Sequence, residues 1–295
     1  MLRSLWMLML SLTLACSDTT GDSAVPPRVP DIFTDGYFIA GHQATALAAI
    51  PPVWLAAAKN LKVHLMGRSH STQVTVGLSR LEADSTNYSC ATGWFSLPEE
   101  AGTLNIYGAQ SGTPYCDFAF YLNNSDGIPG NFTDAQSIHA VLMRAPALSV
   151  SVFLWCRDLD SMTSNQVHDY LVQLALLEAQ YTNVQFVYAT GNADADGAAG
   201  HLRARNNRQI RDWVKLGNNR LLFDYEDIIT HAWNGSSWIQ STYTLNGTNV
   251  PFINPAYNPA VNGPEYEYTH ANETGCREVA KAFWTPLARI AGWEG

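Results

Sequence analysis

Five short apolar runs rich in β-branched residues are separated by segments with helical periodicity, and this alternation is what most limits how the chain can fold. The runs cover residues 61–66, 103–108, 148–155, 184–190 and 220–224. Apolar residues spaced by three and four predict helices over residues 51–60, 134–144, 163–181, 202–216 and 276–291. Strands that alternate with helices are joined in parallel. We therefore expect an α/β fold with a mostly parallel, five-stranded sheet and helices on both faces.

Length and charge narrow the class of protein further. With 295 residues, of which 46% are hydrophobic, the chain can bury a sizeable core. The formal net charge is −9 and the cations are scattered, so no basic stripe is available to neutralise phosphates and nucleic acid is not expected as a partner. We expect a single domain over residues 36–295, with a loop-rich insertion near residues 233–266.

The N-terminus has the features of an export signal. Arg3 precedes an apolar stretch over residues 5–14, which is too short to span a bilayer. The sequence "LTLAC" at residues 12–16 resembles a bacterial lipobox, which implies cleavage before Cys16 and lipidation of its thiol. An ordinary secretory signal is the alternative. Residues 1–15 are therefore predicted to be a signal peptide.

Residues 16–35 are rich in Ser, Thr, Asp, Gly and Pro and predict a flexible tether, because they offer little apolar surface for packing. Ser17 follows the lipidation site where aspartate would favour retention in the inner membrane of enteric bacteria. We therefore expect a lipid-anchored protein at the outer membrane or cell surface, with a periplasmic or secreted protein as the alternative. The anchor is the only membrane contact expected.

Four cysteines remain if Cys16 is lipidated, and an even number in an exported protein favours disulfides. They are Cys90, Cys116, Cys156 and Cys276. Three pairings are possible. We favour Cys90–Cys116, which closes a local loop, together with Cys156–Cys276. A zinc site is disfavoured because no C-x-x-C spacing occurs.

Ligands of open parallel sheets bind beyond the carboxyl ends of the strands. The first, third, fourth and fifth predicted strands are followed there by residues 67–73, 156–158, 191–197 and 225–230. These four loops should meet in space. The residues expected at the rim of a substrate site are His70, Gln73, Asp158 and Asp194.

The loops contain the parts of a nucleophilic site. A serine hydroxyl needs a base, most often a histidine that is oriented by a carboxylate. Ser69 follows Gly67 at a predicted strand-to-helix turn, and Glu267 stands three residues before His270. The glycine-bearing loop around Gly130 could supply a backbone N–H to an oxyanion hole.

The order of these features resembles the SGNH, or GDSL-like, hydrolase family, and within it a narrower set of bacterial exported proteins. The stretches that carry the resemblance are "SHSTQ", "GIPGN", "VFLWC", "LEAQYTNVQFVYATGNADADG", "RNNRQIRDW", "LLFDYEDI" and "AFWTPLARIAGW". The resemblance implies a flavodoxin-like, three-layer α/β/α fold. It also implies hydrolysis of esters, often of acyl groups on sugars or lipids, without an organic cofactor or a metal ion.

The resemblance assigns roles to individual residues. Ser69 is the nucleophile, His270 the base and Glu267 the acid that orients it, where the family more often has aspartate. The N–H groups of Ser69 and Gly130 are the oxyanion donors. The expected reaction is ester hydrolysis through an acyl-serine intermediate.

Two departures from the family's pattern bear on activity. Arg68 stands where an aspartate commonly precedes the serine. Asp158 stands near the place of a third oxyanion donor, where an ionised carboxylate would oppose the developing charge. Asn192 could replace that donor through its amide. The alternative is that Asp158 pairs with Arg157 or another cation and that the site is impaired.

Other interpretations remain open. Ser71 is a second candidate nucleophile. Asn192, Asp194 and Asp196 copy the first half of a calcium loop, but Arg203 replaces its closing glutamate. Finally, the chain contains nine Trp and thirteen Tyr residues. These include Trp233, Trp238 and Tyr243, which would suit a non-catalytic, glycan-binding lipoprotein on the same fold.

Overall fold

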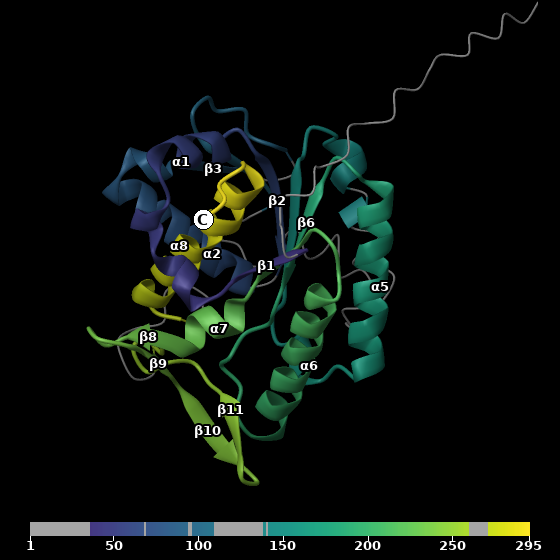
Figure 1. Cartoon of the computed structure of the whole chain (residues 1–295), viewed down its shortest axis with the longest axis vertical. Coiled ribbons are helices and arrows are strands. Elements are labelled where there is room, and N and C mark those ends of the chain that lie inside the picture. The colour runs from purple at the N-terminus through teal and green to yellow at the C-terminus, as the bar shows by residue number, and fades with distance from the viewer. Residues whose placement is uncertain (1–35, 68, 94–95, 109–137, 140, 260–270) are drawn as a thin grey trace, which may run out of the picture.

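The fold is built on one parallel sheet (Figure 1). The computed structural model describes residues 36–67, 69–93, 96–108, 138–139, 141–259 and 271–295, without the Ser69 side chain. The seven strands of the sheet are β1 (Tyr37–Ala40), β2 (Lys62–Gly67), β3 (Cys90–Gly93), β4 (Leu104–Tyr107), β5 (Val150–Leu154), β6 (Gln185–Ala189) and β7 (Arg220–Phe223). Their order is β1-β7-β6-β5-β2-β4-β3, and every neighbouring pair is parallel.

The predicted α/β class is confirmed, whereas the predicted number of strands is wrong. All five expected strands are present, as β2, β4, β5, β6 and β7, and they form the centre of the sheet. The two additional strands, β1 and β3, lie at its edges and have four residues each. β1 reads Tyr-Phe-Ile-Ala, which is apolar but only four residues long, and β3 reads Cys-Ala-Thr-Gly, which contains no apolar run.

Helices cover both faces of the sheet (Figure 1). They are α1 (Pro52–Ala58), α2 (Ser69–Asp84), α5 (Ser164–Gln180), α6 (Gly197–Lys215), α7 (Tyr225–Thr230) and α8 (Glu273–Ile290), with short 3-10 turns η1 (His42–Thr45), η2 (Leu47–Ala49), η3 (Thr86–Tyr88) and η4 (Asp158–Asp160). Part of the helix expected over residues 134–144 is helical, at 138–139 and 141–144.

Alternation along the strands divides the apolar side chains between the two faces. Val152 and Leu154 of β5 join a core cluster with α1, α2, α7 and α8. Phe153, which lies between them, joins a second cluster with α5 and α6. Apolar contacts on both faces hold the sheet in place and leave the carboxyl ends of its strands for polar loops.

A close contact between two helices fixes the start of α2. A side chain at Gly77 of α2 would collide with the backbone carbonyl of Cys276 in α8. Glycine therefore lets the two helix backbones approach each other directly. The contact orients α2, whose first residues follow β2 at the carboxyl edge of the sheet.

The stretch expected to be a loop-rich excursion contains two antiparallel hairpins. One joins β8 (His231–Trp233) to β9 (Trp238–Gln240), and the other joins β10 (Thr242–Leu245) to β11 (Thr248–Pro251). They project from the lower end of the molecule beside α7 (Figure 1). Among the described residues, no helix combines the length and the apolar character needed to cross a bilayer.

Candidate functional site

The loops that follow four central strands meet at one edge of the sheet, as the sequence predicts. His70, in the first turn of α2, has its Nε2 atom 3.8 Å from Oδ2 of Asp194, in the loop after β6. The His70 ring also meets Tyr225, the first residue of α7, edge to face at 5.6 Å between centroids. Arg157, in the loop after β5, interacts electrostatically with Asp194. We call His70, Asp194 and Tyr225 the central cluster.

The central cluster is mostly buried. His70 and Tyr225 are each 2% exposed, while Asp194 is partly exposed. Of the other residues expected at the rim, Gln73 and Asp158 are also buried. Burial raises the pKa of the Tyr225 hydroxyl well above its ordinary value, with further contributions from Cys276, Asp194 and Cys156. The hydroxyl therefore keeps its proton near neutral pH and can donate a hydrogen bond.

Asn192 lies beside this cluster in a polar but buried position. Its Nδ2 group donates a hydrogen bond to Oδ1 of Asp194. Its own Oδ1 atom is buried and accepts no hydrogen bond from the described residues. A buried acceptor without a donor is costly. This oxygen is therefore available to an O–H or N–H group of a ligand or water.

The β2–α2 turn explains the glycine two residues before Ser69. A Cβ atom on Gly67 would lie 2.5 Å from the carbonyl oxygen of Leu154 and 3.1 Å from Cβ of Ser71. Glycine is therefore needed for β2 to pass so close to β5. Ser69 is the first residue of α2, and Ser71 is buried.

Several residues that carry the predicted chemistry lie outside the described part of the chain. They are the Ser69 side chain and the residues Cys16, Arg68, Cys116, Gly130, Glu267 and His270. The nearest described residue to the predicted base is Ala271. It is fully buried in the core cluster that also contains Tyr225.

Asp158 begins the short turn η4, and its backbone carbonyl accepts hydrogen bonds from Ser161 and Met162. Of the cations that the alternative offered to Asp158, Arg157 pairs with a different carboxylate. Arg157 instead binds Asp160, with its Nε atom 3.0 Å from Oδ2. Burial raises the pKa of Asp160, although the hydrogen bond from Arg157 opposes this. The Arg157 guanidinium thus forms both a hydrogen bond and an ion pair with Asp160.

A buried ionic network that the sequence analysis missed supports the loops. The Arg203 guanidinium of α6 is fully buried, 3.5 Å from Oε1 of Glu226. Arg211 pairs with both Asp224 and Glu226, at 2.6 and 2.9 Å. Arg203 also donates hydrogen bonds to the carbonyls of Ala195 and Pro251. Arg203 stands at the position where a calcium loop has its closing carboxylate. Its guanidinium instead binds the backbone carbonyl of Ala195 within that loop.

The cysteines differ from the predicted arrangement. Cys156 and Cys276 do not form the predicted disulfide with each other. Cys90 also forms no disulfide with a described residue, while Cys116 lies outside that part of the chain. Burial raises the pKa of the Cys90 thiol to about 12, so it is protonated near neutral pH. Cys156 and Cys276 both interact electrostatically with Tyr225, and neither forms a disulfide with a described residue.

A second polar cluster lies near the β1 edge of the sheet and was not predicted. His42 follows β1, Asp227 lies in α7, and His231 begins β8. His42 contacts Oδ2 of Asp227 through both its backbone N–H and its Nδ1 atom, at 2.7 Å each. Nδ1 of His231 lies 3.3 Å from Oδ1 of Asp227, and the two imidazole rings stack at 4.1 Å. We call these three residues the edge cluster.

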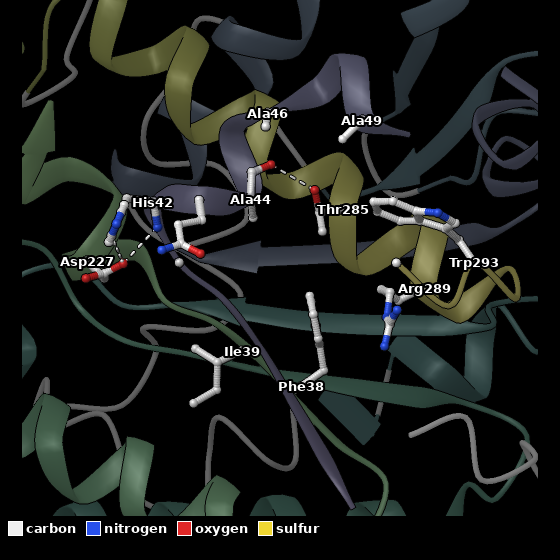
Figure 2. Close-up of a pocket in the computed structure, with 13 residues that line it drawn as sticks. Phe38, Ile39, His42, Ala44, Ala46, Ala49, Asp227, Thr285, Arg289 and Trp293 are labelled. Atoms are coloured by element: carbon white, nitrogen blue, oxygen red, sulfur yellow. Dashed lines mark hydrogen bonds and ion pairs between the residues drawn. The ribbon is translucent and has the colours of Figure 1, made fainter. Parts of the chain in front are cut away.

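The edge cluster borders a cavity of about 380 Å³. Figure 2 shows His42 and Asp227 at one end of this cavity and Arg289 and Trp293 at the other. Apolar side chains from β1, η1 and η2 line the space between them, including Phe38. The described residues therefore form two polar clusters, and the sequence predicted only the buried one.

No protein-family model matches the chain, and no curated protein matches it at a significant level.

Proposed function

We propose that this protein is a serine ester hydrolase of the SGNH type, with a flavodoxin-like, three-layer fold and an active site at the carboxyl edge of its sheet. The observation that carries the proposal is the turn from β2 to α2. Gly67 is held against Leu154, and Ser69 is the first residue of the following helix, directly before His70 of the central cluster. A serine at a helix N-terminus benefits from the positive end of the helix dipole when its oxygen becomes negative.

The proposed reaction needs a base that is not part of the central cluster. His270, oriented by Glu267, would take the proton of Ser69 as the hydroxyl attacks the ester carbonyl. The N–H groups of Ser69 and Gly130 would stabilise the oxyanion. Collapse of the tetrahedral intermediate would release the alcohol, which receives the proton from His270. Water, deprotonated by the same histidine, would then hydrolyse the acyl-serine.

Asn192, which lies beside the central cluster, would support this chemistry with a polar side chain that is buried away from water. The Asn192 Nδ2 group is held by Asp194, which leaves its second hydrogen for an oxyanion or a substrate oxygen. The Asn192 Oδ1 atom, which lacks a donor among the described residues, could accept from the attacking water or from a substrate hydroxyl. A polyol ester, such as an acylated sugar, offers such hydroxyls next to its ester group.

The remaining predictions complete the proposal. We propose export with residues 1–15 as signal peptide, a lipid anchor on Cys16, and a tether over residues 16–35 that leads to β1. The substrates would then be glycan or lipid esters near the membrane surface. Neither nucleic acid nor an organic cofactor has a role.

Labelling with a fluorophosphonate probe tests the nucleophile. The wild type should be labelled on Ser69, and Ser69→Ala should lose all labelling. Ser71→Ala is the matched control, because Ser71 is buried two residues further along and should be dispensable for labelling. Labelling that survives Ser69→Ala but not Ser71→Ala would move the nucleophile to Ser71. A folded wild-type protein that is not labelled would contradict the hydrolase proposal.

A second candidate function, glycan binding without turnover, is favoured by one observation. Trp233 is 55% exposed on the β8–β9 hairpin and packs against Trp238 at 5.6 Å between ring centroids. Exposed aromatic rings bind the apolar faces of sugars. Tyr243 does not contribute to this surface in the same way, because its hydroxyl donates to the carbonyl of Gly197. Glycan binding that persists in Ser69→Ala and is lost in Trp233→Ala would support this function.

A further inference from the structure

We propose that the edge cluster of His42, Asp227 and His231 is a binding site for a divalent metal ion of the zinc type. This inference is independent of ester hydrolysis, because it uses no residue of the proposed catalytic machinery. Two imidazoles and one carboxylate are a ligand set that suits zinc and other first-row divalent ions.

The distances within the cluster fit a shared ion. One ligand atom from each of the three residues lies within 4.8 Å of the other two. The closest approaches to the carboxylate are 2.7 Å for Nδ1 of His42 and 3.3 Å for Nδ1 of His231. Ligand atoms about 2.1 Å from a metal ion stand about 3.0 Å apart in octahedral and about 3.4 Å apart in tetrahedral coordination. Small side-chain movements would therefore complete the site.

The backbone brings these ligands together from distant parts of the sequence. Asp227 and His231 are four residues apart, which places them on one face of the turn that ends α7. His42 comes from the other end of the chain, directly after β1. Gly41 makes this approach possible, because a Cβ atom there would collide with Oδ2 of Asp227. The cluster is thus assembled by the fold and does not depend on one loop.

The charge and exposure of the cluster also suit a cation. Asp227 forms ion pairs only with the two histidines among the described residues, so no lysine or arginine neutralises its charge there. The side chains of His42, Asp227 and His231 are 19%, 26% and 13% exposed, which leaves a path for an ion. Because His42 and Asp227 line the adjacent cavity, a water molecule or a small anion has room there as a further ligand.

Metal binding would change the protonation pattern of the imidazoles. Nδ1 of His231 lies 2.8 Å from the backbone carbonyl oxygen of Asp227, and a carbonyl can only accept, so this nitrogen carries the ring proton in the metal-free state. Coordination through Nδ1 moves that proton to Nε2, with no net proton release from a neutral ring. The ¹⁵N chemical shifts of His231 should report this tautomer change.

The test uses the full chain with ZnCl₂ in isothermal titration and CoCl₂ in visible absorption. We expect one Zn²⁺ per chain, a higher Tm with zinc, and a cobalt absorption band. The double variant His42→Gln/His231→Gln should bind zinc at least 100-fold more weakly. His201→Gln, which removes an exposed histidine of α6, is the matched control and should bind like the wild type.

Gly41→Ala provides a second variant that keeps all three ligands. Its methyl group would displace the Asp227 carboxylate, so zinc affinity should fall about tenfold or more while Ser69 labelling stays unchanged. The proposal is overturned if the wild type binds no zinc, or if the double variant binds it as tightly as the His201→Gln control. Neither result affects the hydrolase proposal, since fluorophosphonate labelling does not depend on this site.

Discussion

The central cluster and the edge cluster differ in burial, in origin and in predictability, although α7 contributes to both. Tyr225 and Asp227 are only two residues apart, yet Tyr225 is buried against His70 and Asp227 is partly exposed between two histidines. The central cluster comes from loops that follow strongly apolar central strands. The edge cluster comes from a short edge strand and a hairpin. The rule that ligands bind beyond the carboxyl ends of parallel strands can therefore locate a polar site only when the sequence already identifies the strand before it.

The largest expected effect concerns the network that supports both clusters. Glu226 lies between Tyr225 and Asp227 on α7 and is paired with Arg203 and Arg211. Arg203→Met leaves a buried carboxylate without one of its partners and should destabilise the protein by about 3–5 kcal/mol.

Urea denaturation monitored by circular dichroism measures the loss. Arg208→Met, an exposed position on the same helix, should change stability by less than about 0.5 kcal/mol. If Arg203→Met is as stable as this control, α7 is held in place by its apolar contacts alone, and the two clusters do not share a support.

Gly67→Ala separates the two clusters. The added methyl group would press against the carbonyl of Leu154, a backbone atom that cannot move aside, so we expect a loss of about 1–3 kcal/mol. The displaced turn should also reduce Ser69 labelling by at least tenfold, while zinc binding stays unchanged. Gly41→Ala should give the opposite pattern. Equal effects of both substitutions on both readouts would show that the clusters are not separate.

A buried histidine outside both clusters makes the stability of the protein depend on pH. His64 in β2 is fully buried beside Ser151, and burial lowers its pKa from 6.5 to about 3. The unfolded chain therefore binds a proton between pH 6.5 and pH 3 that the native state does not. The stability that the neutral His64 contributes is complete above pH 6.5 and is lost as the pH falls through this range.

At pH 5 this loss amounts to about 2 kcal/mol. Denaturation of wild type and His64→Gln at pH 7 and pH 5 measures it, because the glutamine can keep a hydrogen bond to Ser151 but does not titrate. The stability difference between the two pH values should be about 2 kcal/mol smaller in the variant. His201→Gln, at an exposed position, should behave like the wild type.

The parts of the fold that could be predicted from the sequence are those with a strong local signal. The runs around Val152 and Val187 identified central strands, because both faces of such strands are buried and only apolar residues fit. The strand-end rule then indicated correctly that His70 and Asp194 would meet. Ser69 was likewise expected at a strand-to-helix turn, which the start of α2 confirms.

Other features depend on tertiary contacts that leave no local pattern. His42 and Asp227 are 185 positions apart, and only the pairing of β1 with β7 brings them together. Arg203 was considered only as a misplaced calcium ligand, because nothing in the sequence shows that its guanidinium is fully buried against Glu226. In both cases, the fold places a charged or titratable side chain next to its partner: His42 beside Asp227, and Arg203 beside Glu226.

The position of β1 has a mechanical consequence. This strand is the first described element of the chain, and it is paired in parallel with β7 from Tyr37–Arg220 to Ala40–Phe223. A pull along the strand would load these backbone hydrogen bonds together, in shear, and would not open them one after another. The next residues to bear the load are Gly41 and His42. A metal ion bound by His42, Asp227 and His231 would therefore fasten the segment after β1 to α7.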